Sequence, residues 1–319
     1  MKKLLTGLVA LALLTACGTT APEQQDTAKT SQSADAAQFP RTVSVGGTDV
    51  EVPAKPQRIA VLTPDLASLV LPLVGKDRVV MASEMNPELG KVAEEAAAVP
   101  HVVKVGAPVD PEQVLASNPD LVLISARHDG EKDATAMLKQ SGVPLAVVSS
   151  DDWSSIDDIL THLDEVAKLV GEEDAGKELR SSIEAERAKV LKKVEGEPTV
   201  LTMMSRGGKN LIMSKTTMLN GLVREVGGKP VIDELGAPGS APADPETIVK
   251  AAPEVIIIQN YRGRGAEDFK AVLENPALAD VPAIKNGRVY YVDTATTGVT
   301  SAAKITKGLA QVSEFLTTK

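Results

Sequence analysis

Side chains that can bind anions or iron lie in three short segments, each directly after a run of aliphatic residues. The segments are rich in arginine and also contain histidine, tyrosine and methionine: Arg127 with His128, Met204 with Arg206, and Tyr261 with Arg262 and Arg264. Arginine guanidinium groups pair with carboxylates through two parallel hydrogen bonds. Tyrosine and histidine side chains are both iron ligands in proteins. Together these segments favour a large anionic ligand that contains iron, held through Tyr261 or His128 if the protein touches the metal.

The aliphatic runs before these segments predict the strands that position them. Four runs are short and apolar enough to form fully buried strands, namely 58–62, 121–126, 199–203 and 255–260. The first of them ends next to Thr63, which we add to the candidate ligand-binding residues. Ligands of open α/β sheets bind off the carboxyl ends of the strands. The sequence therefore predicts a ligand site where these strand ends meet.

An internal repeat sets the order of the elements. Residues 110–126 and 244–260 match in kind almost position by position, at a constant offset of 134 residues. Each copy starts with Asp-Pro-Glu, which suits a helix N-cap followed by proline at the first helical position. A short helix, a proline, an acidic residue and a buried strand follow in both copies. The repeat predicts two similar α/β lobes with largely parallel sheets and a ligand cleft between them.

The rest of the chain divides by composition. From residue 154 onwards, apolar residues recur at three- and four-residue spacing, which predicts a long helical linker between the lobes. Valines at alternating positions around Gly46 and Gly47 predict a hairpin at the start of the first lobe. We expect five parts: a signal peptide (1–16), a disordered tether (17–40), an N-terminal lobe (41–150), the linker (151–195) and a C-terminal lobe (196–319).

The N-terminal segment predicts an exported lipoprotein. Lys2 and Lys3 precede an apolar run that is too short to span about 30 Å of hydrocarbon, which is typical of a cleaved signal peptide. The run closes with Leu-Thr-Ala-Cys at 14–17, and Cys17 is the only cysteine of the chain. Its thiol can carry a diacylglycerol that anchors the protein on the extracytoplasmic face of the cell membrane. The alternative is an ordinary secretory signal cleaved near a cysteine.

Composition disfavours several other functions. The formal net charge of −9 argues against a nucleic acid or an anionic lipid surface as partner. Three scattered histidines do not suit a zinc or manganese carrier. There is no Gly-x-Ser-x-Gly motif, and the glycines at 227–228 lack the Ser or Thr of a phosphate-binding loop. We expect a monomeric binding protein without a cofactor, and not an enzyme.

With these motifs in this order, the chain resembles the substrate-binding proteins of class III ABC importers, which bind iron-siderophores, haem or cobalamin. The resemblance covers nearly the whole exported chain and rests on segments 52–61, 106–112, 118–124, 244–246, 252–257 and 286–290. It implies a periplasmic binding protein fold and delivery of an iron complex to a permease dimer with a cytoplasmic ATPase. In similar proteins a surface glutamate on each lobe docks on the permease, which implies this role for Glu112 and Glu246. The alternative is that each acid only suits the dipole of its helix.

The sequence leaves the cargo open. An arginine-rich cleft with few aromatic residues favours a ferric siderophore. Haem is the alternative, with Tyr261 or His128 near the iron and Arg262 and Arg264 near the propionates. Cobalamin is less favoured because only 2% of the residues are aromatic and available for stacking. The alternative with a different class of function is a surface sensor or an extracytoplasmic enzyme with the same fold.

Overall fold

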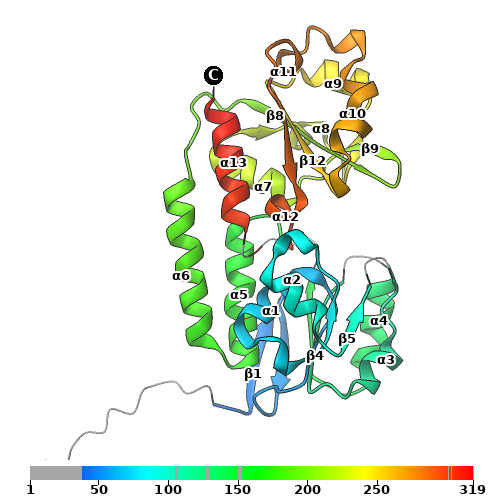
Figure 1. Cartoon of the computed structure of the whole chain (residues 1–319), viewed down its shortest axis with the longest axis vertical. Helices are drawn as coiled ribbons and strands as arrows, with labels where there is room; N and C mark the ends of the chain where they lie inside the picture. The colour runs from blue at the N-terminus through cyan, green and yellow to red at the C-terminus, as the bar shows by residue number, and fades with distance from the viewer. Residues whose placement is uncertain are drawn as a thin grey trace, which may run out of the picture. The chain divides into compact units, whose positions relative to one another are not determined.

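The computed structural model describes residues 38–104, 107–126, 129–149, 153–300, 302 and 304–318. Figure 1 shows its helices and strands with the labels used below. The predicted signal peptide, and the tether up to residue 37, lie outside the described residues. Among the described residues, no helix is both long and apolar enough to cross a membrane.

A five-stranded parallel sheet forms the N-terminal lobe, in the order β5-β4-β3-β6-β7. Its strands are β3 (Ile59–Val61), β4 (Val79–Ser83), β5 (His101–Val103), β6 (Leu121–Ala126) and β7 (Leu145–Ser149). Its helices are α1 (Pro64–Val74), α2 (Lys91–Ala97), α3 (Pro111–Ala116) and α4 (Asp129–Lys139), with 3-10 turns η1 (Lys76–Arg78) and η2 (Pro87–Leu89). Alternate residues of β3 and β6 enter two separate apolar clusters, one with α1 and α2 and one with α3 and α4. Helices on both faces explain why these strands are apolar throughout.

A two-stranded hairpin precedes this sheet, as the valine pattern predicts. Strands β1 (Arg41–Val45) and β2 (Thr48–Val52) are antiparallel. Gly46 and Gly47 form the turn between them with φ of 54° and 76°, the region that a two-residue hairpin turn of this kind requires. A Cβ on Gly46 would lie 2.8 Å from the main-chain oxygen of Val147, so glycine also allows the hairpin to approach β7.

The C-terminal lobe has a six-stranded sheet in the order β11-β9-β8-β12-β13, with β10 also pairing with β8. Its strands are β8 (Thr199–Arg206), β9 (Lys209–Ile212), β10 (Lys229–Pro230), β11 (Ala241–Pro242), β12 (Val255–Asn260) and β13 (Val289–Asp293). Its longer helices are α7 (Met218–Val226), α9 (Pro245–Ala251), α10 (Gly265–Leu273) and α13 (Ile305–Thr317). Shorter turns are α8 (Ile232–Leu235), η3 (Tyr261–Gly263), η4 (Pro276–Leu278), α11 (Pro282–Lys285) and α12 (Thr294–Thr297). Strands β10, β8, β12 and β13 are parallel, so the expected fold class is confirmed.

The helical segment expected between the lobes consists of two antiparallel helices, α5 (Ile156–Val170) and α6 (Glu173–Val190) (Figure 1). Arg187 near the end of α6 pairs with Asp157 near the start of α5, and Arg180 pairs with Asp164. The apolar face of α5 contacts α1 and β1 of the N-terminal lobe and also α7 of the C-terminal lobe. One continuous apolar cluster therefore includes residues of both lobes.

Trp153 begins this connection and is completely buried, so it is a packing residue. Its ring contacts that of His162, with 4.7 Å between the ring centroids. The next residue approaches α7 closely, because a Cβ on Gly221 would lie only 1.8 Å from the main-chain oxygen of Ser154. A glycine at this position of α7 is therefore required by packing.

The internal repeat is confirmed at its helix starts. The Asp110 side chain accepts a hydrogen bond from the Glu112 amide at 2.9 Å, and the Asp244 side chain accepts one from the Thr247 amide, also at 2.9 Å. Proline occupies the first turn of both helices. These contacts are the N-caps that the repeated Asp-Pro-Glu predicts.

The turn from helix to strand is also the same in both copies. Asn118 and Ala252 hold equivalent positions and have φ of 50° and 41°, so both are in the left-handed region. The carboxylate of Asp120 then accepts from the amides of Gln57 and Arg58 at 2.7 and 2.9 Å. Its counterpart Glu254 accepts from the Thr199 amide at 2.9 Å. In each lobe the repeat thus attaches its acid to the start of the neighbouring strand.

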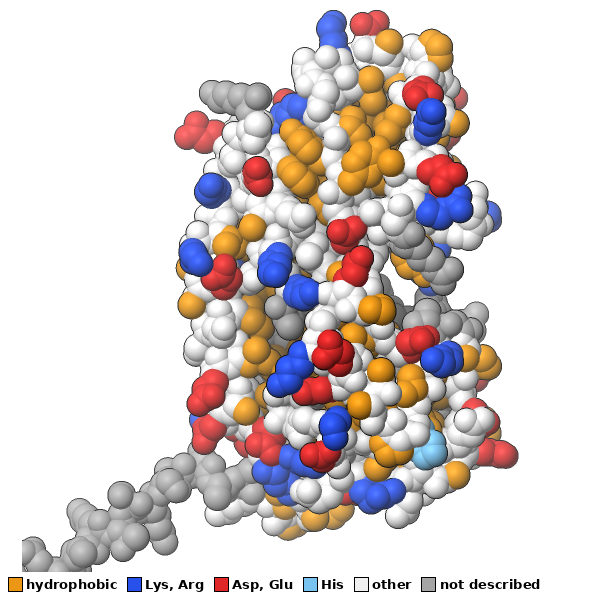
Figure 2. Space-filling model, in the orientation of Figure 1, with side chains coloured by type: hydrophobic (Ala, Val, Ile, Leu, Met, Phe, Trp, Pro, Cys, Tyr) orange, Lys and Arg blue, Asp and Glu red, His pale blue; other side chains and the backbone are white. Residues whose placement is uncertain are grey.

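Acidic and basic side chains are mixed over the face drawn in Figure 2, and neither sign forms a separate region there. Many of the ion pairs join residues three or four positions apart on one helix, such as Lys177 with Asp174 and Arg180 with Glu184. Exposed pairs of this kind each contribute about 0.5 kcal/mol or less. The fold therefore depends on its apolar clusters and its buried hydrogen bonds.

Candidate functional site

The carboxyl ends of β8 and β12 bring four of the candidate residues together. The two strands are parallel neighbours, and Gln259 is in register with Met204. Arg206 ends β8, while Tyr261 begins η3 directly after β12, and η3 contacts β8. Arg264 follows η3 at the start of α10. The predicted meeting of these segments at one sheet edge is thus found for Met204, Arg206, Tyr261 and Arg264.

A hairpin adds Lys209, a cation that the sequence analysis missed, to the site. Strand β9 is antiparallel to β8, and Lys209 lies directly opposite Arg206 across the turn Gly207-Gly208, whose φ angles are 60° and 72°. Both cations are exposed, and neither side chain has an ion pair or hydrogen bond within the described ranges. Like charges directly opposite each other on paired strands are unfavourable. The arrangement is therefore ready to receive an anion. The residues Arg-Gly-Gly-Lys at 206–209 are the signal from which this hairpin turn could have been predicted.

Arg264 differs from this pair because acids of its own helix already neutralise it. Its guanidinium lies 3.1 Å from the Asp268 carboxylate and 3.7 Å from that of Glu267. Its side chain is 61% exposed, so a ligand would have to compete with both acids in water. The side chain of Arg262 lies outside the described part of the structure.

Two amide side chains fix the loop that carries Tyr261. The Asn260 side chain accepts from the Gly265 amide at 2.8 Å and donates to the Asp293 carboxylate at 3.1 Å. Gln259 is buried and donates to the Thr297 hydroxyl at 3.0 Å. Tyr261, which is partly buried, therefore begins η3 from an anchored strand end. Asn260 and Gln259 were not candidates from the sequence, because their partners Asp293 and Thr297 are more than thirty residues away.

The carboxyl edge of the N-terminal sheet has a different character. Thr63 is 2% exposed, and its hydroxyl accepts from the Ser125 amide at 3.1 Å, which joins the ends of β3 and β6. This hydrogen bond supports a structural role for Thr63. At the end of β5, Lys104 lies 3.1 Å from the Glu84 carboxylate. Arg127 and His128 lie outside the described residues, and the ligand contacts expected of them stay predictions.

The two candidate docking acids occupy equivalent places. Glu112 and Glu246 are both exposed in the first turn of their helices, α3 and α9. Cys17, the candidate lipidation site, lies outside the described residues. No group of three or more His, Cys, Asp or Glu side chains in the described ranges is placed to hold a metal ion.

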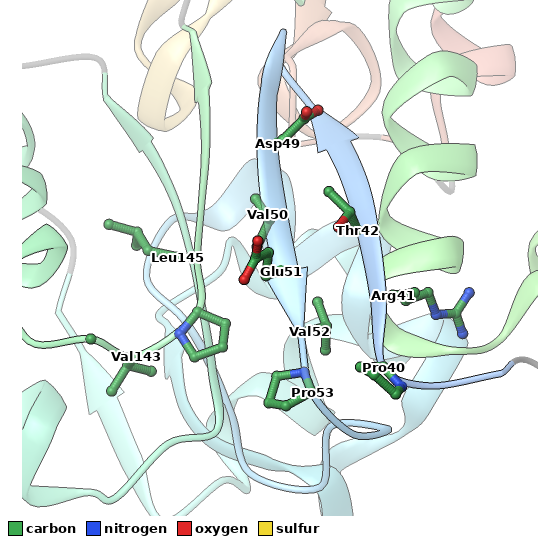
Figure 3. A pocket seen from close by; sticks show the side chains of 12 residues that line it. Pro40, Arg41, Thr42, Asp49, Val50, Glu51, Val52, Pro53, Val143 and Leu145 are labelled. Carbon is green, nitrogen blue, oxygen red and sulfur yellow. The ribbon is translucent and has the colours of Figure 1, made fainter.

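Two cavities lie away from this edge. One, of about 610 Å³, is lined by the hairpin β1–β2 and residues 142–145 at the amino end of β7 (Figure 3). The Arg41 side chain turns away from β7 there and pairs with Glu173. The other, of about 400 Å³, lies between β5 and the start of α3. Neither cavity includes Tyr261 or the hairpin cations, so neither matches the site that strand topology predicts.

Solved structures share the fold of this protein. The chain resembles a periplasmic haem-binding protein, RhuT, from Roseiflexus sp. RS-1 (TM-score 0.66, 22% identity, 82% of this chain and 97% of that one). It also resembles a structure described as an ABC-type Fe³⁺-hydroxamate transport system from Saccharomonospora viridis DSM 43017 (TM-score 0.68, 19% identity, 87% and 99% covered). At this identity the likeness concerns the fold.

Sequence comparison gives the family. Residues 59–296 match the model of the periplasmic binding protein family, so the chain belongs to this family of extracytoplasmic binding proteins. A characterised relative is the petrobactin-binding protein YclQ of Bacillus subtilis (strain 168), 25% identical over 311 residues that cover 93% of this chain and 92% of that protein. The resemblance inferred from the ordered motifs is thereby confirmed.

Proposed function

We propose that this protein is the extracytoplasmic receptor of an ABC importer and that it captures a negatively charged ferric siderophore. The observation that carries the proposal is the pair Arg206 and Lys209, two cations without acidic partners in the described structure, next to Tyr261 at the carboxyl edge of the sheet. Membership of the family and a relative named for petrobactin binding support it. Binding to such groups releases the repulsion between them and adds charge-assisted hydrogen bonds.

The methionines favour a siderophore over haem. A haem site needs a broad apolar wall, and Met203, Met213 and Met218 are each exposed by 3% or less because they pack in the core. Met204 is the partly exposed member of the group. A polar chelate needs no such wall. Haem stays the second candidate, because Tyr261 with Arg264 is a combination that can meet an iron and a propionate.

A titration of the purified exported domain tests the proposal. Ferric petrobactin, a ferric hydroxamate and haemin are added separately, and binding is followed by calorimetry and by absorbance. We expect a ferric siderophore to bind at one site and Tyr261→Phe to weaken it about tenfold. Binding of haemin alone, with a Soret shift that Tyr261→Phe removes, would replace the siderophore with haem. Absence of binding by all three would overturn the proposal.

Delivery and anchoring complete the proposed function. Glu112 and Glu246 dock on a permease dimer that works with a cytoplasmic ATPase, and a lipid on Cys17 retains the protein at the membrane. The double variant Glu112→Ala, Glu246→Ala should abolish uptake of the iron chelate by cells while the affinity for the chelate is unchanged. The Cys17→Ser variant should appear in the culture medium or the soluble periplasmic fraction. Normal uptake by the double variant would contradict the docking role.

A further inference from the structure

We propose that Leu115 and Val249 form, with Glu112 and Glu246, two equivalent docking patches for a partner built from two copies of one subunit. The N-terminal patch is Glu112 with Leu115, and the C-terminal patch is Glu246 with Val249. Each patch meets a pocket that combines a cation with an apolar surface. The inference rests on the proposed function, since the partner is the membrane component that receives the cargo.

The exposure of the two aliphatic residues is the first observation. Among the described residues, the large hydrophobic side chains on the surface are Leu115 (38% exposed), Met137 (54%), Val249 (45%) and Tyr291 (39%). Leu115 and Val249 hold equivalent positions of the internal repeat, at the same offset that relates Glu112 to Glu246. Single exposed aliphatic residues are common and need no explanation. The same exposed aliphatic side chain at both copies of a repeat does need one.

Helix geometry places each aliphatic residue beside its acid. Glu112 and Leu115 are three residues apart on α3, as are Glu246 and Val249 on α9, and such residues share a helix face. The residue directly before each aliphatic residue points inward, since Val114 and Ile248 are exposed by 1% and 0%. Each patch is therefore one acid and one aliphatic side chain, adjacent on the outer face of a short helix.

The backbone around the two patches is held in the same way. Both helices start from an aspartate N-cap, and both end in a left-handed turn, at Asn118 and at Ala252. The acid that follows each turn is bonded to the start of the neighbouring strand. The two patches are thus held by the same kinds of contact, although the surrounding residues differ. A surface duplicated to this degree fits a partner that is itself duplicated.

The chemistry of a patch defines the partner pocket. A carboxylate alone pairs with a cation, but exposed ion pairs are weak and are screened by salt. An adjacent aliphatic side chain adds burial of apolar surface, which salt does not screen. The two groups therefore predict two separable contributions. Loss of the acids makes docking less dependent on salt, whereas loss of the aliphatic groups weakens docking at every salt concentration.

Crosslinking in living cells tests where the patches dock. The photoreactive residue p-benzoylphenylalanine replaces Leu115, Val249 or, as a control, the more exposed Met137 of the full-length protein. We expect positions 115 and 249 to crosslink to the same membrane subunit, identified by mass spectrometry, and position 137 to give no such product. Crosslinks to two different proteins, or to none, would overturn the inference. This readout does not depend on which chelate is bound.

Uptake measurements test whether the contact matters. Cells that carry Leu115→Ser with Val249→Ser should take up radioactive ferric petrobactin at least fivefold more slowly, whereas purified protein with these changes should bind it within twofold of the unchanged chain. Met137→Ser should leave both values unaltered. Uptake at the normal rate, while Glu112→Ala with Glu246→Ala remains inactive, would overturn the inference and leave the proposed function intact. If crosslinks form but the purified protein binds no ferric chelate, the docking patches stand and the proposed cargo falls.

Discussion

The two sheets share a repeat but differ at the edge where ligands bind. In the N-terminal sheet, the strand that pairs with the repeat's strand β6 is β3, which has three residues and lies between two parallel neighbours. Its counterpart β8 has eight residues and continues into the antiparallel strand β9. Because β8 is longer, Arg206 lies two residues beyond Met204, which is in register with Gln259. The hairpin then places Lys209 opposite Arg206. The repeat therefore provides the common scaffold, and the added hairpin makes one edge cationic.

The state of the cations at the two edges follows from this difference. Lys104 at the N-terminal edge lies 3.1 Å from Glu84, while Arg206 and Lys209 at the other edge face each other. A paired cation must give up its acid before it binds an anion. The comparison therefore predicts that the C-terminal hairpin contributes most of the affinity among the described cations.

Removing the hairpin cations should have the largest effect. We expect Arg206→Ala with Lys209→Ala to weaken binding of ferric petrobactin about 100-fold, because a hydrogen bond to a charged group contributes about 1.5–3 kcal/mol and about 1.4 kcal/mol corresponds to tenfold. Arg264→Ala and Lys104→Ala, whose cations already have acidic partners, should each change the affinity about threefold or less. Calorimetric titration measures all three. An equal loss in Lys104→Ala would remove the distinction between the two edges.

Removal of the acids that follow the repeated helices should have the next largest effect, which is on the free energy of unfolding. Asp120 accepts two main-chain hydrogen bonds and is partly buried, so Asp120→Ala should lower the free energy of unfolding by about 2–3 kcal/mol. Glu254 is exposed and accepts one main-chain hydrogen bond, so Glu254→Ala should cost about 1 kcal/mol. Urea unfolding measures the difference, with Glu94→Ala as the exposed control. Equal losses of unfolding free energy would mean that Asp120 and Glu254 stabilise the fold to the same extent.

The left-handed turns allow a finer comparison. A non-glycine residue in this region costs about 1–2 kcal/mol, and asparagine tolerates it better than alanine does. Ala252→Gly should therefore raise the free energy of unfolding by about 0.5–1 kcal/mol after the greater freedom of the unfolded glycine is subtracted. Asn118→Gly should change it by less. A destabilised Ala252→Gly variant would show that the turn in the second copy is not strained.

The smallest expected effect concerns acid pH. Hydrogen bonds from the Thr247 amide and hydroxyl lower the pKa of the Asp244 carboxyl below its usual value. Stabilisation by this cap is therefore complete above about pH 4 and is lost as the pH falls through the lowered pKa. Asp244→Asn keeps a capping oxygen but does not titrate. In thermal unfolding, its small stability deficit at pH 7 should disappear once the pH is below the lowered pKa of Asp244. A deficit that stays constant with pH would contradict the assignment.

Local features of the fold were predictable because they depend on neighbouring residues. The hairpin at 41–52 follows from alternating valines around two glycines, and the starts of α3 and α9 follow from Asp-Pro-Glu. The buried strands follow from short aliphatic runs between turn residues. The position of Tyr261 at a strand end was predictable for the same reason, since it directly follows such a run.

Side-chain roles were less predictable where the partner is distant in the sequence. Thr63 was a candidate ligand residue, yet its hydroxyl is buried against the Ser125 amide. Arg264 was a candidate for the same reason as Arg206, but an ion pair with Asp268 distinguishes them. Lys209 was overlooked because the sequence analysis did not recognise the hairpin turn Gly207-Gly208, which places Lys209 opposite Arg206.

Caps, turns and aliphatic periodicity act over a few residues, and from them came the two α/β units, their helices and the ends of their strands. Strand order, the reach of β8 beyond its neighbours and the pairing of each cation depend on which segments pack together, and only the folded chain determines these. Burial is the physical reason for the difference. The same arginine or threonine binds a ligand or supports the fold according to the groups that tertiary packing brings within hydrogen-bonding distance.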